Sequence, residues 1–84
     1  MSTSRDTQRA DDQIVTLLSH WLTRTLGNDE LRRKIQEIGT DELAPGQRNA
    51  VGELLGELAA AAPGERGQLE VVVRETIETL VYGD

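Results

Sequence analysis

Residues 68–82 have the sequence QLEVVVRETIETLVY, and their conformation determines the fold class of this 84-residue chain. Three consecutive valines and several later β-branched residues favour a strand. A lone strand, however, would have no segment elsewhere in the chain with which to pair. The side chains at helical spacing also line one face: Leu69, Val73, Thr76, Ile77 and Leu80. We therefore predict a helix over residues 68–82.

Three further helices are predicted upstream of this segment. The first covers residues 11–26, where apolar side chains occupy about half of the helix circumference and so indicate packing against two neighbours. The second covers residues 29–38, with Gly27 as the left-handed residue that ends the first helix and Asn28 as the cap of the second. Pro45 suits the first position of a third helix, which Pro63 and Gly64 end.

The segment Thr40–Leu43 repeats the pattern of residues 28–31, a capping residue followed by two acids and a leucine. Pro45 cannot donate a backbone hydrogen bond and disfavours helical geometry before it, so this second copy is limited to one turn. We predict an all-α fold, a small bundle of four principal helices with a short extra turn near residues 40–44.

Residues 1–10 lack the apolar content needed for order and are predicted to be a disordered N-terminal tail, with residues 11–84 as a single helical domain.

The charge of the chain is acidic and unevenly distributed. Nine Lys and Arg face fifteen Asp and Glu, a net charge of −6, and residues 41–84 carry the entire acidic excess. An acidic surface repels the phosphates of nucleic acid, so direct binding is disfavoured. The absence of cysteine excludes disulfides and thiolate metal sites. No apolar run reaches the ~18 residues of a membrane span, and we expect a cytoplasmic protein.

Candidate catalytic and metal-binding residues are few. His20 is the one histidine, and it falls on the polar side of the first predicted helix without an orienting acid nearby in the sequence. Neighbouring glutamates share helix faces, but no Glu-x-x-His pair accompanies them, as a di-iron bundle requires. The glycines form no phosphate-binding loop. We expect no enzymatic activity, cofactor or metal.

The third predicted helix contains Gly52 and Gly56, four residues apart, with Ala59 beside them on the helical wheel. A glycine inside a helix costs ~1 kcal/mol relative to alanine, so two of them weaken the helix. A smooth groove of small residues allows another helix to approach closely and recovers part of this loss. The occupant is either another helix of the same chain or a second molecule.

The last predicted helix carries a second candidate surface, opposite its core stripe. Val71, Glu75, Glu78 and Tyr82 share this face, and tyrosine is a common interface anchor because an apolar ring bears one polar atom. Together the two surfaces give the predicted partner-binding residues: Gly52, Gly56, Ala59, Val71, Glu75 and Tyr82.

These observations predict a non-enzymatic protein–protein interaction module that acts by helix-face docking. It would be a small intracellular adaptor, regulator or accessory subunit, with a protein partner or a second copy of itself as its ligand. An alternative is an antitoxin-like or repressor-like regulator that contacts nucleic acid through the basic cluster Arg32, Arg33 and Lys34. A third possibility is a small enzyme built around His20.

Overall fold

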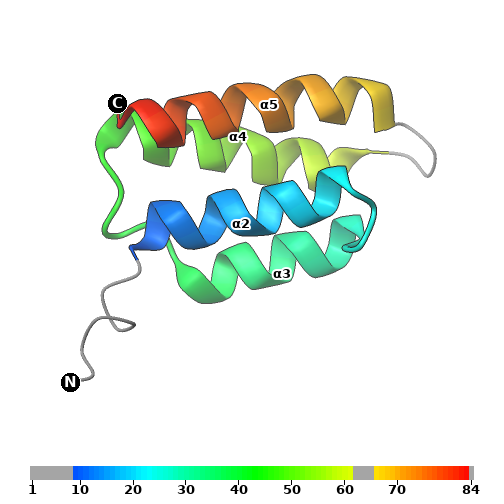
Figure 1. Cartoon of the computed structure of the whole chain (residues 1–84), viewed down its shortest axis with the longest axis horizontal. Helices are drawn as coiled ribbons and strands as arrows, with labels where there is room; N and C mark the ends of the chain where they lie inside the picture. Colours follow the sequence, from blue (N-terminus) through cyan, green and yellow to red (C-terminus); the bar gives the residue numbers. More distant parts are fainter. Residues whose placement is uncertain (1–8, 62–65, 84) are drawn as a thin grey trace.

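The computed structural model describes residues 9–61 and 66–83, and these residues form four helices (Figure 1). They are α2 (Ala10–Leu22), α3 (Asn28–Ile38), α4 (Pro45–Ala60) and α5 (Arg66–Tyr82). The β-branched segment 68–82 is therefore helical, as predicted, and the fold is an all-α bundle.

Consecutive helices run antiparallel, and each one packs against two others (Figure 1). α2 lies between α3 and α5, and α4 also contacts both α3 and α5. The four helices thus form a closed ring in which α3 and α5 are diagonally opposite. The wide apolar stripe of α2 is explained by its two neighbours, which confirms the prediction.

Each helix supplies apolar side chains to the core at spacings of three and four residues. Fully buried examples are Ile14, Leu18, Trp21, Leu31, Ile35, Val51, Leu54 and Val73. Burial of each such side chain contributes ~1.5–3 kcal/mol. Thr76 is also buried, and its hydroxyl donates to the carbonyl oxygen of Val72 at 2.8 Å, so the core accommodates it without an unpaired polar atom.

α2 ends at Leu22, four residues before the predicted end. Arg24 takes the left-handed conformation, with φ of 68°, and Gly27 does not. The backbone N–H of Thr25 donates to the carbonyl oxygen of His20, and that of Arg24 donates to Trp21, each at 3.0 Å. This pair of bonds is a Schellman motif, and it closes the helix before Gly27 is reached.

The predicted role of Asn28 as a helix cap is also wrong. Asn28 is the first residue of α3, and Gly27 occupies the capping position without a side-chain hydrogen bond. The side chain of Asn28 instead accepts a hydrogen bond from Trp21, because the buried indole N–H needs a partner.

The remaining boundaries agree closely with the sequence pattern. Residues 40–44 contain one turn, in which the N–H of Leu43 donates to the carbonyl oxygen of Thr40 at 3.1 Å. Pro45 is the first residue of α4. Ala10, assigned to the predicted tail, is buried and begins α2, whereas residues 1–8 of that tail lie outside the described residues.

Candidate interaction surface

α5 carries the large apolar side chains that the described residues leave exposed. Val71 is 50% exposed, Val81 is 65% exposed and Tyr82 is 78% exposed. Val71 and Tyr82 were predicted on this face, together with Glu75 and Glu78, and all four are exposed. Val81 was missed because it lies between the core stripe and the predicted stripe, where the sequence pattern gives no clear assignment.

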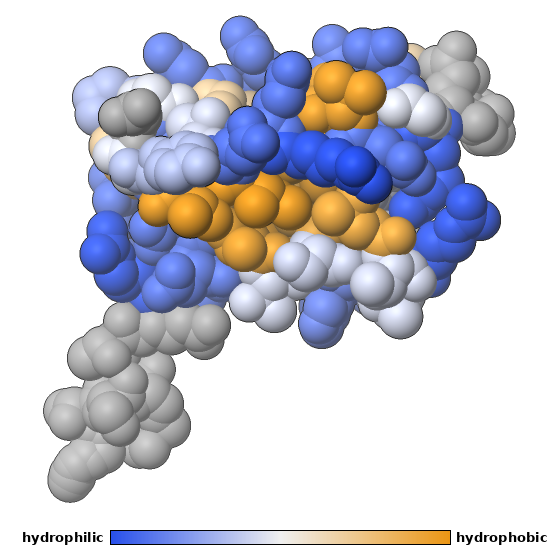
Figure 2. Space-filling model, turned by 45° about the horizontal axis from the view of Figure 1, so that its top comes forward, coloured by the Kyte–Doolittle hydropathy of each residue, from blue (hydrophilic) through white to orange (hydrophobic). Residues whose placement is uncertain are grey.

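A continuous apolar surface follows the seam between α5 and α2 and appears as the orange band in Figure 2. On α5, the side facing α2 is marked by Arg66, which binds Trp21, and Ile77 and Val81 recur on that side at helical spacing. On α2, Val15 and Leu22 are partly buried and lie on the side away from α3. We call Val15, Leu22, Ile77 and Val81 the apolar band.

Arg66 fixes the start of α5 against the end of α2. Its guanidinium lies over the ring of Trp21, with Cζ 3.9 Å from the ring centroid. Its Nη2 donates to the carbonyl oxygen of Trp21 at 2.7 Å, and its Nε lies 3.9 Å from a carboxylate oxygen of Glu70. The indole N–H of Trp21 in turn donates to Asn28 at 2.6 Å. One buried aromatic ring thus joins α2, α3 and α5.

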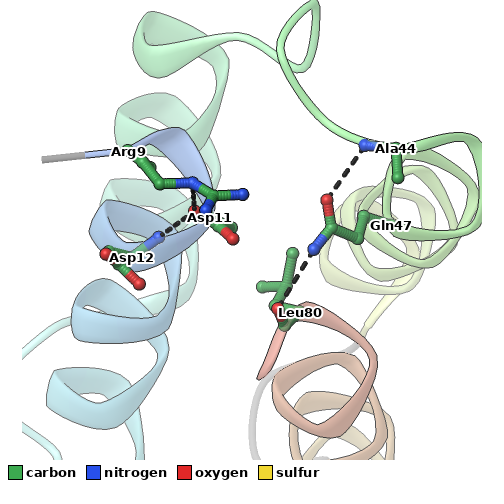
Figure 3. A network of polar contacts seen from close by, with 6 residues as sticks. All are labelled: Arg9, Asp11, Asp12, Ala44, Gln47 and Leu80. Atoms are coloured by element: carbon green, nitrogen blue, oxygen red, sulfur yellow. Dashed lines mark hydrogen bonds and ion pairs between the residues drawn. The ribbon is translucent and has the colours of Figure 1, made fainter. Parts of the chain in front are cut away.

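Gln47 fixes the other end of α5 (Figure 3). Its side-chain oxygen accepts from the backbone N–H of Ala44 at 2.9 Å, and its Nε2 donates to the carbonyl oxygen of Leu80 at 3.0 Å. Gln47 is 3% exposed, so these bonds are shielded from water. Gln47 is not among the residues predicted from the sequence, although glutamine at the third position of a helix is typical of a capping box.

Figure 3 also shows a polar cluster at the start of α2. Nε of Arg9 lies 3.4 Å from a carboxylate oxygen of Asp11, and the same oxygen accepts from the backbone N–H of Asp12 at 2.9 Å. Carboxylates in the first turn are favourable because they face the positive end of the helix dipole. The cluster is explained by helix stability and adds nothing to the exposed apolar surface.

The small-residue stripe of α4 consists of Gly52, Gly56 and Ala59, and all three are exposed. A Cβ added at Gly52 or Gly56 would meet no atom within 4 Å. Among the described residues, no helix of this chain therefore occupies the groove, and that alternative is wrong. Occupation by a second molecule stays a prediction.

The structure does not bring all six predicted residues into one surface. Ala59 borders a hollow of about 560 Å³ at the start of α3, together with residues 27–30. Gly52 lies seven residues before Ala59 and therefore on the same side of α4. Val71, Glu75 and Tyr82 lie on the outer face of α5, so the two predicted groups form separate surfaces.

The candidate chemical groups lie apart from these surfaces. His20 is exposed on α2, and the described residues contain no group of three His, Cys, Asp or Glu that could hold a metal ion.

In the basic cluster, Arg33 is exposed, whereas Arg32 and Lys34 are partly buried. Nη2 of Arg32 lies 4.0 Å from a carboxylate oxygen of Asp29. Within the described ranges, no helix has the length and apolar character needed to cross a membrane.

Comparison with protein-family models, with curated proteins and with solved structures found no match to this chain. Function must therefore be inferred from the surface of the fold itself. Two parts of the described surface are apolar: the exposed residues of α5 and the apolar band beside them.

Proposed function

We propose that this chain is a non-enzymatic protein–protein interaction module, such as an adaptor, a regulator or an accessory subunit, that docks through α5. The observation that carries this proposal is the concentration of exposed Val71, Val81 and Tyr82 on one helix. Scattered single apolar residues are normal on protein surfaces, but clustered ones mark contact sites. The apolar band extends the cluster across the seam to α2.

The contacts that hold both ends of α5 in place favour binding. Arg66 anchors its first turn on Trp21, and Gln47 holds the carbonyl oxygen of Leu80 in its last turn. A docking helix that is fixed at both ends loses little conformational freedom when a partner binds, which lowers the cost of association. The three exposed apolar side chains are thus presented on a firmly held element.

Charge supports a protein ligand over a nucleic acid. The chain has a net charge of −6, and Glu75 and Glu78 are exposed beside Val71 and Tyr82. Acidic groups around an apolar contact guide the approach of a complementary protein surface and repel phosphates.

Site-specific photo-crosslinking tests the proposal. A photoreactive phenylalanine analogue is placed at Val71 or at Tyr82, both exposed on α5, and at Gln36, which is exposed on α3, as the matched control. Irradiation in cell extract, followed by mass spectrometry, should give protein adducts from the two α5 positions and none from the control. Equal labelling from all three positions, or no adduct from α5, would refute docking through this helix.

A further inference from the structure

The outer face of α5 carries a regular stripe of exposed residues at alternating spacings of four and three. This is the spacing with which one helix contacts another along its length. The stripe consists of Gly67, Val71, Arg74, Glu78 and Val81. Val81 lies at its edge toward α2 and so also belongs to the apolar band. Apolar residues occupy positions toward both ends, and two opposite charges lie between them.

Four residues of the stripe are placed symmetrically about Thr76. Val71 and Val81 lie five residues before and after Thr76, and Arg74 and Glu78 lie two residues before and after it. A contact between two identical subunits related by a two-fold axis requires that when one residue meets a second, the second also meets the first. Along the helix, these four residues are apolar, positive, negative and apolar. In an antiparallel pair, this order places each apolar residue against an apolar residue and each charge against the opposite charge.

We infer that the outer face of α5 binds α5 of a second copy of this chain, antiparallel and crossing at the level of Thr76. The inference rests on the proposed function, because it takes α5 as the docking element, and it adds the identity of the partner. In this arrangement Val71 of each copy meets Val81 of the other, with Tyr82 beside it. Arg74 of each copy meets Glu78 of the other, so this charge pair occurs twice in the dimer.

The charged groups are available for such pairing. Among the described residues, neither Arg74 nor Glu78 takes part in an ion pair, whereas Arg66 and Glu70 on the same helix do. Arg74 precedes Glu78 by one helical turn, which is the less favourable order for a pair within one helix. An approaching second copy therefore meets free charges of both signs, in reversed order.

The expected association is weak and reversible. A helix of 17 residues is ~25 Å long, and the contact of one such helix with its copy falls below the ~1,200 Å² of a standard interface. Glu75 lies on one flank of the stripe and would come near Glu75 of the second copy on that flank. This repulsion weakens the dimer further, and Glu75→Gln should strengthen it.

Charge reversal in the purified full chain tests the inference by sedimentation equilibrium, from micromolar to millimolar concentration. The wild type should form dimers. Arg74→Glu and Glu78→Arg, each made alone, replace both interhelical charge pairs by pairs of like charge. Each variant should weaken association roughly tenfold or more. Glu78→Arg also reduces the net negative charge, so loss of association in this variant cannot be due to general repulsion.

Mixing the two single variants supplies the decisive measurement. In a heterodimer of Arg74→Glu with Glu78→Arg, every reversed charge meets an opposite one, and the mixture should associate as the wild type does. The double variant should also dimerise. Glu53→Arg, which changes an exposed residue of α4 by the same charge, is the control and should leave dimerisation unchanged. Restored association in the mixture also shows that both single variants are folded.

The outcomes separate this inference from the proposed function. A wild type that is monomeric at millimolar concentration, or single variants that dimerise as the wild type does, overturns pairing with a second copy. If α5 nevertheless crosslinks to a different protein, the interaction module stands and only the identity of its partner is wrong. If the purified chain is monomeric and α5 gives no adduct, both proposals fail.

Discussion

The guanidinium of Arg66 lies over the indole of Trp21, with Cζ 3.9 Å from the ring centroid, and its Nη2 donates to the carbonyl oxygen of the same residue at 2.7 Å. The two residues are 45 positions apart in the chain, so this contact joins the end of α2 to the start of α5. Trp21 is fully buried, and Arg66 covers its ring. This pair, together with the core residues of α5, holds the helix and its exposed apolar face in position.

Replacement of Arg66 by Ala should lower the free energy of unfolding by about 1–3 kcal/mol, because it removes the cation–π contact and a charge-assisted hydrogen bond to a backbone carbonyl. Arg66→Lys should recover only part of the loss, since an ammonium lacks the planar stacking surface. Urea unfolding followed by the fluorescence of Trp21 measures both. Arg33→Ala on the exposed face of α3 is the control and should change stability little; an equal loss there would contradict the assignment.

Gln47→Ala should lower the free energy of unfolding by about 1–3 kcal/mol and loosen the last turn of α5. The substitution leaves the backbone N–H of Ala44 and the carbonyl oxygen of Leu80 without their side-chain partner in a buried site. Hydrogen exchange of the amides near Leu80 should become faster. The matched change Gln36→Ala, at an exposed position of α3, should leave that exchange unaltered. Unchanged protection in Gln47→Ala would show that Gln47 does not hold α5.

Arg24→Gly should raise the free energy of unfolding by about 0.5–1 kcal/mol. Arg24 has φ of 68°, a conformation in which Cβ crowds the following carbonyl oxygen and which glycine adopts without this cost. Arg24→Ala keeps Cβ and should give no such gain, which makes it the control. Thermal and urea unfolding of both variants measure the difference. Equal stabilities of the glycine and alanine variants would show that the left-handed conformation of residue 24 does not lower the stability of the protein.

The sequence predicted the features that depend on periodicity. The four helices of residues 9–61 and 66–83, the wide stripe of α2 and the exposure of Val71 and Tyr82 follow from which positions share a helix face, and the structure confirms them. Periodicity does not report how a helix ends. The sequence predicts Gly27 as the left-handed residue, but the N–H of Thr25 donates to the carbonyl oxygen of His20, and Arg24 takes that conformation.

Contacts between distant segments gave no signal in the sequence. Arg66 lies at the start of α5, and nothing local indicates that its guanidinium stacks on Trp21. Gln47 follows Pro45 at a position typical of a capping role, but its second bond, to Leu80, depends on the packing of α4 against α5. Periodicity placed the small-residue stripe of α4 on a helix face, but could not show that Gly52 and Gly56 stand open or that Ala59 borders the start of α3.

Gly52→Ala and Gly56→Ala should each raise the free energy of unfolding by about 0.5–1 kcal/mol. Both glycines are exposed inside α4, and a new Cβ would meet no atom within 4 Å, so the gain in helix propensity is not offset by a clash. The reverse change, Ala59→Gly, should lower stability by a similar amount. Urea unfolding measures all three, and a loss of stability in either alanine variant would show that the added methyl group is not accommodated.

Gly56→Leu distinguishes the two predicted surfaces. Gly56 is exposed, a Cβ added there meets no atom within 4 Å, and the stripe that contains Gly56 lies on α4, apart from the outer face of α5. If docking uses α5, the variant should keep its helical circular dichroism and should associate as the wild type does in sedimentation. Loss of association with intact helicity would instead assign docking to Gly52, Gly56 and Ala59, because only an approaching backbone at that groove would meet the new leucine.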